Sequence, residues 1–212
     1  MKEKQISYYA QRAHEYEKIY HKPERQEDLR KLELLLPQCV EAKSVLEIGC
    51  GTGYWTQFMS KTAKSILATD INEAMLEIAR SKSYPNIPEF IALDYEQLDE
   101  MEGQYDLIFA GFVVSHIRRE NLTDFLSKLS RRLKMGGEII FMDNVFVEGS
   151  NTPISEKDKH GNTFQERSLE DGSKHKVLKN FYEADDWARE LSNPIEFAKM
   201  RLSYFYLLRI IY

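Results

Sequence analysis

The sequence has few cysteines and no long apolar run. Its two cysteines among 212 residues, Cys39 and Cys50, do not suggest a disulfide framework. No apolar stretch approaches the length that crosses a bilayer, and Met1 to Ala10 is charged and polar, unlike the apolar core of a signal peptide. We therefore expect a protein of the reducing cytoplasm that is not attached to a membrane.

Basic residues are not in excess either. The chain has 29 Lys and Arg against 34 Asp and Glu, a net charge of −5 at pH 7. This balance offers no electrostatic footprint for nucleic acid, although it leaves a local basic patch open. The five histidines show no HxH or HxxxH spacing and give no metal signal. With 42% hydrophobic residues and no internal repeats, the chain is expected to form one globular domain.

A glycine-rich motif, VLEIGCGTG, runs from Val45 to Gly53. Its first residues are apolar and β-prone, which suits a strand covered on both faces. Gly49, Gly51 and Gly53 then allow a tight turn whose backbone can approach a ligand closely. The residues from Tyr54 onward favour a helix. A strand, a glycine-rich turn and a helix together predict a nucleotide-type ligand site at the carboxyl end of a sheet.

Strand and helix patterns alternate over the first two thirds of the chain. Strands are predicted at Ser44–Ile48, Ser65–Asp70, Ile87–Leu93, Tyr105–Ala110 and Glu138–Val147. Helices are predicted at Glu3–Tyr20, Glu24–Leu36, Tyr54–Lys61, Glu73–Lys82 and Leu122–Leu133, with Lys134–Gly137 ending the last one. This order favours a doubly wound α/β fold with a mostly parallel sheet and helices on both faces.

The pattern changes after Val147. Glu148–Gly161 is polar and rich in turn formers, and Asp171-Gly172 is a strong hairpin signal. The elements predicted after the loop are strands at Thr163–Leu169 and Ser173–Phe181, a helix at Tyr182–Leu191 and strands at Ile195–Leu202 and Tyr204–Ile211. The last two strands are joined too tightly for a helical crossover, so we expect them to be antiparallel.

Glu47, two positions before the first glycine, indicates which ligand the turn binds. Its carboxylate would repel a pyrophosphate and attract an amino group. The spacing is G-x-G-x-G, whereas the dinucleotide fingerprint is G-x-G-x-x-G. With EIGCGTG at Glu47 to Gly53, the segment resembles the first motif of the class I S-adenosylmethionine-dependent methyltransferases. YDLIFAG at Tyr105–Gly111 and LKMGGEIIF at Leu133–Phe141 resemble the fourth-strand and fifth-strand motifs of that family.

The resemblance implies a single methyltransferase domain with a seven-stranded, Rossmann-like sheet and an antiparallel C-terminal hairpin strand. The expected parts are an N-terminal helical cap over 1–40, a core over 41–147 and 183–212, and an inserted loop and small β-hairpin over 148–182. In this fold such an insertion commonly covers the acceptor pocket. We expect its polar side chains to lie on the surface rather than to act in catalysis, namely His160, Arg167, His175 and Tyr182.

The resemblance also implies which residues bind S-adenosylmethionine, with S-adenosylhomocysteine as the product. Asp70 would accept hydrogen bonds from the ribose hydroxyls, although an Asp at this place also suits a helix N-cap. Ile71 would pack on the adenine face. Asp94 and the backbone of Tyr95 would bind the exocyclic amine, and the alternative for Asp94 is a turn residue. The other expected cofactor residues are Glu47, Gly49, Cys50, Gly51, Gly53 and Ala110, with Cys50 as a small filler rather than a nucleophile.

A row of aromatic residues lies on one face of the first predicted helix. The pattern Tyr-x-x-x-Ala-x-x-Tyr from Tyr9 to Tyr16 resembles a segment that precedes the first motif in many small-molecule methyltransferases. There it forms a lid, and tyrosine or arginine groups reach the methionine carboxylate of the cofactor. Tyr16 and Arg12 are the candidates for this contact. The alternative is a packing face made of amphipathic tyrosines.

His116 and Asp143 are the candidate catalytic residues. His116 follows the fourth strand of the core and could be a general base, an orienting group for the acceptor or a structural histidine. Asp143-Asn144 resembles the pair found in metal-dependent catechol-type O-methyltransferases. Those enzymes also need an acidic ligand for magnesium where this chain has the uncharged residues 110–112. We therefore expect no metal and keep Asp143 as an acid on the acceptor side.

The leading hypothesis is methyl transfer from S-adenosylmethionine to the oxygen or nitrogen of a small molecule by in-line displacement. The cofactor supplies the reactive methyl group, and the protein supplies positioning and electrostatics. A protein or peptide methyltransferase is an alternative, because VVSHI and MDNV resemble segments of protein N-terminal methyltransferases. An NAD-type oxidoreductase or a cofactor-binding protein without catalysis is a further alternative. The sequence does not identify the acceptor.

Overall fold

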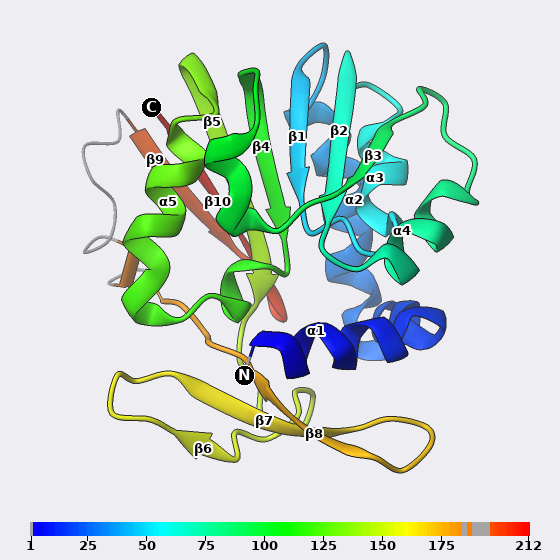
Figure 1. The fold of residues 1–212 in the computed structure, drawn as a ribbon, viewed down its shortest axis with the longest axis vertical. Coiled ribbons are helices and arrows are strands. Elements are labelled where there is room, and N and C mark those ends of the chain that lie inside the picture. The colour runs from blue at the N-terminus through cyan, green and yellow to red at the C-terminus, as the bar shows by residue number, and fades with distance from the viewer. Residues whose placement is uncertain (1, 184–185, 188–195) are drawn as a thin grey trace.

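A seven-stranded sheet with the strand order β3-β2-β1-β4-β5-β10-β9 forms the centre of the molecule (Figure 1). This computed structural model describes residues 2–183, 186–187 and 196–212. The strands of the sheet are β1 Ser44–Ile48, β2 Ser65–Asp70, β3 Glu89–Ala92, β4 Tyr105–Gly111, β5 Leu133–Asn144, β9 Glu196–Arg201 and β10 Phe205–Ile211. β1 to β5 pair in parallel, whereas β10 is antiparallel to both β5 and β9. The predicted fold class is confirmed.

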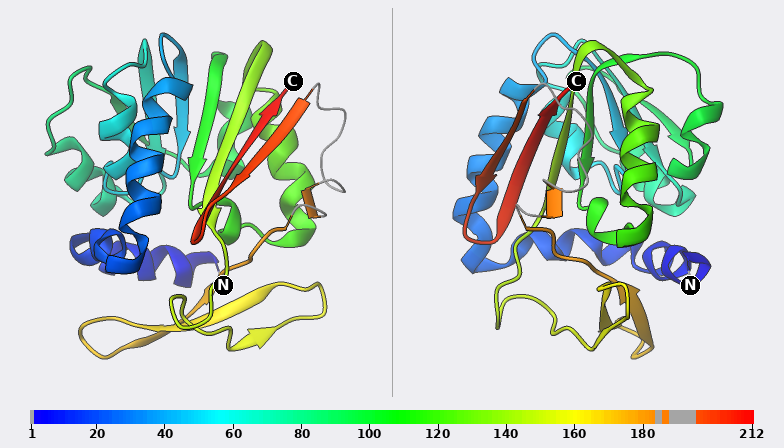
Figure 2. Two further views of the ribbon diagram at one scale, coloured as in Figure 1. Left: turned by 180° about the vertical axis from the view of Figure 1, so that it is seen from behind. Right: turned by 90° about the vertical axis from the view of Figure 1, so that its left-hand side faces the viewer.

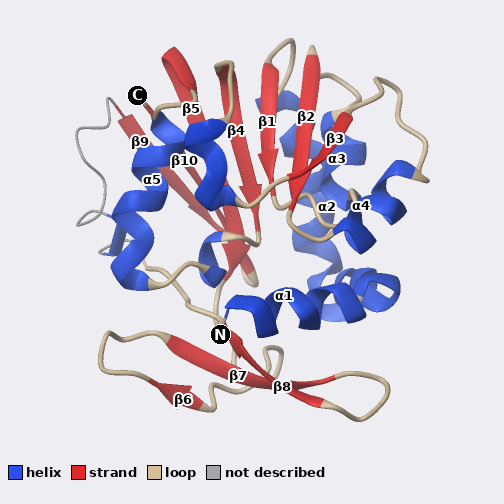
Figure 3. Cartoon of the chain, in the orientation of Figure 1, coloured by secondary structure: helices blue, strands red, loops and turns tan. Residues whose placement is uncertain are grey.

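Helices cover both faces of this sheet, as Figures 2 and 3 show. One face carries α2 Gln26–Cys39, α3 Tyr54–Met59 and α4 Glu73–Arg80, and the other carries α5 Leu122–Ser130. Successive side chains of a strand point to opposite faces, so Leu107 of β4 packs with the first group of helices and Ile108 with α5. Both side chains are fully buried. Burial on both faces explains why these central strands are apolar almost throughout.

The N-terminal segment crosses below the carboxyl ends of the parallel strands (Figure 1). The sequence predicts one helix over Glu3–Tyr20, and this is wrong. The α-helix α1 spans Lys2–Gln11, and a separate 3-10 helix, η1, spans Ala13–His21. The ring of Tyr20 stacks on that of Tyr54 with 3.9 Å between centroids, and its hydroxyl accepts a hydrogen bond from the indole of Trp55. Packing on the core thus outweighs local helix propensity here.

β5 begins earlier than the sequence predicts. The helix expected to reach Leu133 ends at Ser130, and residues 134–137, expected as its terminus, already belong to the strand. The pairing of β4 with β5 shifts register between Tyr105 and Leu107, and Gly136 has a φ of +73° in the irregular part of β5. An irregularity of this kind takes up extra residues in one strand, so a simple alternation of apolar residues does not reveal it.

A second, three-stranded antiparallel sheet lies beyond α1 (Figure 1). It consists of β6 Glu156–Lys157, β7 Thr163–Ser168 and β8 Lys174–Leu178, and β7 and β8 form the predicted hairpin around Asp171-Gly172. β6 lies inside the segment predicted as a loop. Residues 184–185 and 188–191 of the predicted helix Tyr182–Leu191 lie outside the described residues. Within the described part of the chain, no helix has the length and apolar character to cross a membrane.

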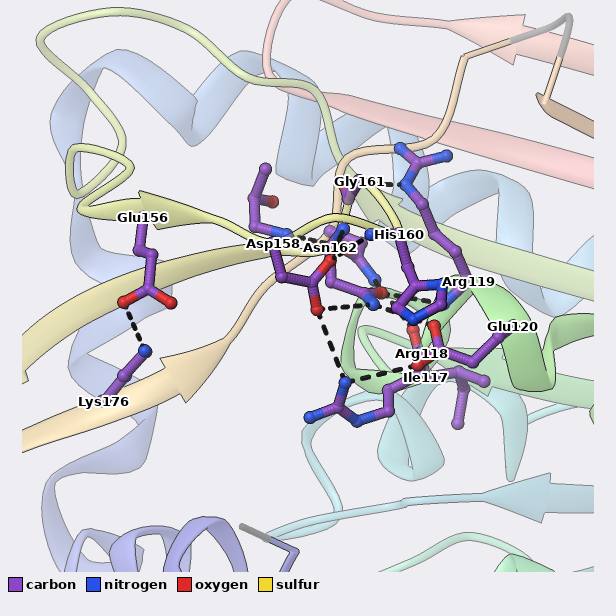
Figure 4. Close-up of polar contacts among 12 residues, drawn as sticks. Ile117, Arg118, Arg119, Glu120, Glu156, Asp158, His160, Gly161, Asn162 and Lys176 are labelled. Atoms are coloured by element: carbon purple, nitrogen blue, oxygen red, sulfur yellow. Dashed lines mark hydrogen bonds and ion pairs between the residues drawn. The ribbon is translucent and has the colours of Figure 1, made fainter.

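The turn between β6 and β7 is bonded to the segment that follows β4 (Figure 4). Asn162 is fully buried, and its side-chain oxygen accepts from the backbone N–H of Arg119 at 2.8 Å. Its side-chain nitrogen donates to Glu120 at 2.8 Å and to Asp158 at 3.1 Å. The side chain of Asn180, which follows β8, donates to Asn162 at 3.0 Å. These bonds fix the small sheet against the segment that carries His116.

Candidate active site

The glycine-rich turn after β1 has the backbone conformation that its sequence predicts. Gly49 has a φ of +67°, in the left-handed region that favours glycine. A Cβ atom at Gly49 would lie 2.5 Å from Cγ2 of Val113, which is closer than two carbon atoms can approach. The residue must therefore be glycine for both its conformation and its close contact with the segment after β4.

This turn forms one wall of a cavity of about 310 Å³ at the carboxyl ends of β1, β2 and β4, which we call the first pocket. Eight predicted site residues line it: Tyr16, Gly49, Gly51, Asp70, Ile71, Asp94, Tyr95 and His116. Six others do not: Arg12, Glu47, Cys50, Gly53, Ala110 and Asp143. Open α/β sheets bind ligands at such a place, where the strand order reverses between β1 and β4.

Asp70, at the end of β2, is positioned by the turn itself. Oδ2 accepts from the backbone N–H of Gly51 at 2.9 Å, and Oδ1 accepts from that of Asn72 at 2.8 Å. Burial raises the pKa of the Asp70 carboxyl, and the bonds from these amides oppose that change. Each oxygen keeps a further lone pair for a donor in the first pocket. The arrangement suits a pair of hydroxyl groups.

Glu47 lies beneath the turn, turned away from the first pocket. It is 2% exposed, and its Oε2 accepts from the hydroxyl of Thr56 in α3 at 2.7 Å. Burial raises the pKa of this carboxyl to about 8, with a smaller contribution from the nearby Asp70. At pH 7 the group is therefore mostly protonated and does not by itself repel a phosphate. Its contribution to ligand binding stays a prediction.

Asp94 forms an ion pair with Lys2 that the sequence did not predict. Lys2 of α1 forms ion pairs with Asp94 at 2.6 Å and with Glu96 at 2.7 Å. Asp94 also accepts from the backbone N–H of Glu96 at 3.0 Å, which makes it the N-cap of the 3-10 helix η3, Tyr95–Glu100. Lys2 and Gln5, both in α1, line this end of the first pocket. The N-terminal turns of α1 thus cover the pocket.

A second pocket, of about 290 Å³, adjoins the first. The two cavities share four lining residues, Tyr9, Tyr16, Phe112 and His116. The other walls of the second pocket come from α1, η1, the end of β5 with the following loop, and the small sheet. Phe112, at the shared boundary, has a φ of +61°, a strained conformation for a bulky residue that is often found at functional sites.

His116, also at the boundary, is held in one tautomer. Its Nδ1 lies 2.6 Å from the carbonyl oxygen of Leu178, so this nitrogen carries the proton and donates it. Nε2 then accepts from the hydroxyl of Tyr9 at 2.9 Å. Burial, together with the charges of Lys179 and Arg167, lowers the pKa of His116 to about 3. The imidazole is therefore neutral at pH 7 and is a hydrogen-bond acceptor at the boundary.

Asp143, at the end of β5, is buried behind the second pocket. Its exposed fraction is 1%, and it forms an ion pair with Lys179 at 2.8 Å. Its other oxygen accepts from the backbone N–H of Ser115 at 3.0 Å. The carboxylate thus orients the segment that carries His116, and a direct role at the acceptor stays a prediction.

Several residues of the two pockets have no signal in the sequence. Lys2, Arg25, Gln165 and Lys179 belong to this group. The sequence pattern places Arg167 on the surface, but the structure places it in the wall of the second pocket, bonded to Tyr9 at 3.2 Å. Each of these side chains reaches a pocket through the packing of α1 and the small sheet on the core.

Parts of the chain are similar in sequence to known methyltransferases. A family model described as a methyltransferase domain matches residues 45–137. The chain is 36% identical to a malonyl-acyl-carrier-protein O-methyltransferase of Priestia megaterium over 46% of its own length and 35% of that protein. It is 31% identical to phosphoethanolamine N-methyltransferase 1 of Zea mays over 56% of its length and 24% of that protein. It is 31% identical to a tRNA U34 carboxymethyltransferase of Pseudoalteromonas atlantica over 58% of its length and 38% of that protein.

Solved structures extend the likeness beyond the matched region. DhpI in a complex with SAM and HEP gives a TM-score of 0.79 at 24% identity, over 98% of this chain and 96% of that one. DhpI in a complex with SAH gives a TM-score of 0.78 at the same identity, over 98% and 95%. The fold is thus shared along almost the whole chain, including the N-terminal cap and the small sheet. The family model over residues 45–137 shows in addition that this part of the chain is similar to a methyltransferase domain.

Proposed function

We propose that this protein transfers a methyl group from S-adenosylmethionine to an oxygen or nitrogen of a small molecule. The observation that carries the proposal is the shared boundary of two pockets at the carboxyl end of the sheet. In-line displacement needs a donor and an acceptor on opposite sides of the carbon that moves. Two adjoining cavities with Tyr9, Phe112 and His116 between them supply such a pair of sites.

The first pocket fits the adenosine part of the donor. The free lone pairs of Asp70 suit the two ribose hydroxyls, and Ile71, which is 37% exposed, offers an apolar surface for adenine. Asp94 would accept from the adenine amine, and Lys2 would keep this acid in place. Gly49 and Gly51 bring the backbone close to the ligand. Tyr16 lines the same pocket and remains the candidate for the methionine end, whereas Arg12 lines the second pocket.

The bound donor supplies a methyl group that is already activated by a sulfonium. The protein's own part is to position and desolvate. Phe112 and Tyr9 close the boundary between the pockets against water, and the neutral His116 holds the Tyr9 hydroxyl in a fixed orientation. Of the three acids that line the first pocket, Asp94 and Glu96 are paired with Lys2, and Asp70 is the acid left to face a positively charged ligand.

Calorimetry with S-adenosylhomocysteine and, separately, NAD tests the donor site. We expect the first to bind and NAD not to bind. Asp70→Asn should weaken binding of S-adenosylhomocysteine about tenfold or more, because hydrogen bonds to a charged group are lost. Asp99→Asn, an exposed acid paired with Arg131, is the matched control and should bind normally. Failure of S-adenosylhomocysteine to bind the wild-type protein would overturn the proposal.

The acceptor class is tested with the labelled methyl donor and a fractionated cell extract. We expect the label in the small-molecule fraction, because the small sheet and α1 enclose the second pocket. Label found only in proteins, or only in RNA, would contradict a small-molecule acceptor while leaving methyl transfer intact.

A further inference from the structure

The second pocket is rich in cations, although the whole chain carries a net charge of −5. Five basic residues line it: Arg12, Lys22, Arg25, Arg167 and Lys179. Glu166 is the one carboxylate in its lining, and this side chain is 57% exposed and paired with Lys174 outside the pocket. The side chains that line the cavity therefore carry more positive than negative charge. Two acids lie next to it outside the lining: Asp143, which pairs with Lys179, and Glu24, which accepts from the Ser150 hydroxyl at 2.8 Å.

Four of these five cations bind neutral oxygens rather than carboxylates. The guanidinium of Arg167 donates to the side-chain oxygen of Gln165 at 2.6 and 3.1 Å and to Tyr9 at 3.2 Å. That of Arg25 donates to Oγ and O of Ser150 at 2.9 and 3.1 Å.

The other cations of the second pocket complete this pattern. Arg12 donates to Tyr8 at 3.0 Å, and Lys22 donates to the carbonyl oxygen of Ser150. Within residues 2–183, 186–187 and 196–212, an ion pair within 4 Å is recorded for Lys179, with Asp143, and for none of the other four.

Burying these cations costs free energy unless an anion joins them. Arg25 is only 7% exposed, and Arg167 and Lys22 are partly buried. Burial lowers the pKa of both Lys22 and Arg25. At Arg167 burial is outweighed by Tyr9 and Tyr8, which raise the pKa. A bound oxyanion would reverse the effect of burial, because it pairs with the charges and receives hydrogen bonds from several donors at once.

The boundary with the first pocket is not arranged for proton removal. Arg167 donates to the oxygen of Tyr9, Tyr9 donates to Nε2 of His116, and Nδ1 of His116 donates to Leu178. The lone pair of His116 is therefore already used, and Lys179, Arg167 and Asp143 are the charged groups around the ring. An acceptor that has lost its proton before it binds needs no base here.

We propose that the methyl acceptor is a small oxyanion, a carboxylate or a phosphate or phosphonate group, held by Arg167, Arg25 and Lys22 in the second pocket. The inference rests on the proposed methyl transfer. One ionised oxygen forms the new bond to the methyl carbon while the carbon–sulfur bond breaks, and sulfur keeps the electron pair as a neutral thioether. No proton moves, and the product is a methyl ester with one negative charge fewer than the acceptor.

Binding of simple anions tests the pocket without knowledge of the natural acceptor. Inorganic phosphate and malonate are titrated into the protein saturated with S-adenosylhomocysteine. We expect at least one of them to bind, with Arg167→Gln and Arg25→Gln each weakening the affinity about tenfold or more. Lys176→Gln is the matched control, since Lys176 lies on the same small sheet but pairs with Glu156 away from the pocket (Figure 4). This variant should bind both anions as the wild type does.

Methyl transfer to a panel of acceptors then distinguishes carboxylate acceptors from phosphate and phosphonate acceptors. The panel holds small carboxylates, phosphate monoesters and phosphonates beside phenols and amines of equal size. A methyl ester formed from one oxyanion class, with inorganic phosphate as a competitor, supports the proposal. Methylation confined to the phenols or amines, or an Arg167→Gln variant that binds anions as the wild type does, overturns it. Unchanged affinity of each variant for S-adenosylhomocysteine shows that the variant is folded. If the wild-type protein did not bind S-adenosylhomocysteine at all, the methyltransferase function itself would be contradicted.

Discussion

The ammonium of Lys179 lies 2.8 Å from Oδ1 of Asp143, and the two side chains are 5% and 1% exposed. The pair joins the end of β5 to the segment that follows β8, so it attaches the small sheet to the core. Lys179 also donates to the hydroxyl of Ser115 at 2.7 Å, next to His116. Burial is the largest single influence and by itself raises the pKa of Asp143, but the charge and hydrogen bond of Lys179, together with His116 and the backbone N–H of Asn144, outweigh it, so the pKa is lowered.

Breaking this pair should destabilise the protein strongly. Asp143→Asn or Lys179→Met alone leaves an uncompensated charge inside the protein, which costs about 3–5 kcal/mol in the free energy of unfolding. The double variant Asp143→Asn with Lys179→Met leaves no buried charge and should recover part of this loss. Urea denaturation of the four proteins measures the effect. Additive losses in the double variant would contradict a direct interaction between the two charges.

Stability should also depend on pH through Glu47. This carboxyl keeps its proton up to a pKa of about 8 in the folded protein but releases it near 4.5 in the unfolded chain. Between these values the unfolded state binds fewer protons, so the free energy of unfolding falls as pH rises from 4.5 to 8. Glu47→Gln removes this cost and should stabilise the protein at pH 8.5 by roughly 2–5 kcal/mol, with a much smaller effect at pH 4.5.

Urea denaturation at the two pH values tests this expectation. The exposed Glu73→Gln is the control and should show no such dependence, because Glu73 lies on the surface of α4. Equal effects of Glu47→Gln at both pH values would show that the carboxyl ionises normally in the folded state.

Local patterns in the sequence were sufficient for the first two parallel strands, but not for the start of β5. β1 and β2 have the predicted bounds, Ser44–Ile48 and Ser65–Asp70, because each is a short apolar run followed by a turn. Asp70 and Asp94 meet in the first pocket because the carboxyl ends of parallel strands lie at one edge of the sheet. These positions follow from the strand order alone.

The acceptor side could not be predicted in the same way. Lys179 reaches Asp143 across 36 positions of the chain, and Arg167 reaches Tyr9 across 158. Such contacts depend on how the small sheet and α1 dock on the core, which no local pattern specifies.

Glu47 is a different case. Its position inside β1, before Ile48, was clear, but the direction of its side chain, toward Thr56 rather than the ligand, depends on the packing of α3.

Gly49 should be essential for binding of the donor. Gly49→Ala places a Cβ 2.5 Å from Val113 and imposes a left-handed conformation on alanine. Gly136→Ala is the matched control, since Gly136 has a similar φ of +73° but no atom within 4 Å of its Cβ position. Both variants should lose about 1–2 kcal/mol for the conformation, and only Gly49→Ala should also lose affinity for S-adenosylhomocysteine. Equal affinities of the two variants in calorimetry would contradict a role for this close contact.

Asn162 should couple the small sheet to the acceptor side without affecting the donor side. Asn162→Ala leaves the backbone N–H of Arg119 without its acceptor, at a cost of about 1–3 kcal/mol. It also removes one of the two acceptors of the Asn180 amide, which keeps the carbonyl oxygen of Ile117 at 2.9 Å. We expect lower thermal stability and weaker binding of inorganic phosphate in the second pocket. Affinity for S-adenosylhomocysteine should stay within about twofold, because Asn162 does not line the first pocket. Asn86→Ala, an exposed asparagine with one hydrogen bond to Ala63, is the control. If Asn162→Ala weakened both ligands equally, the small sheet would support the whole site rather than the acceptor side.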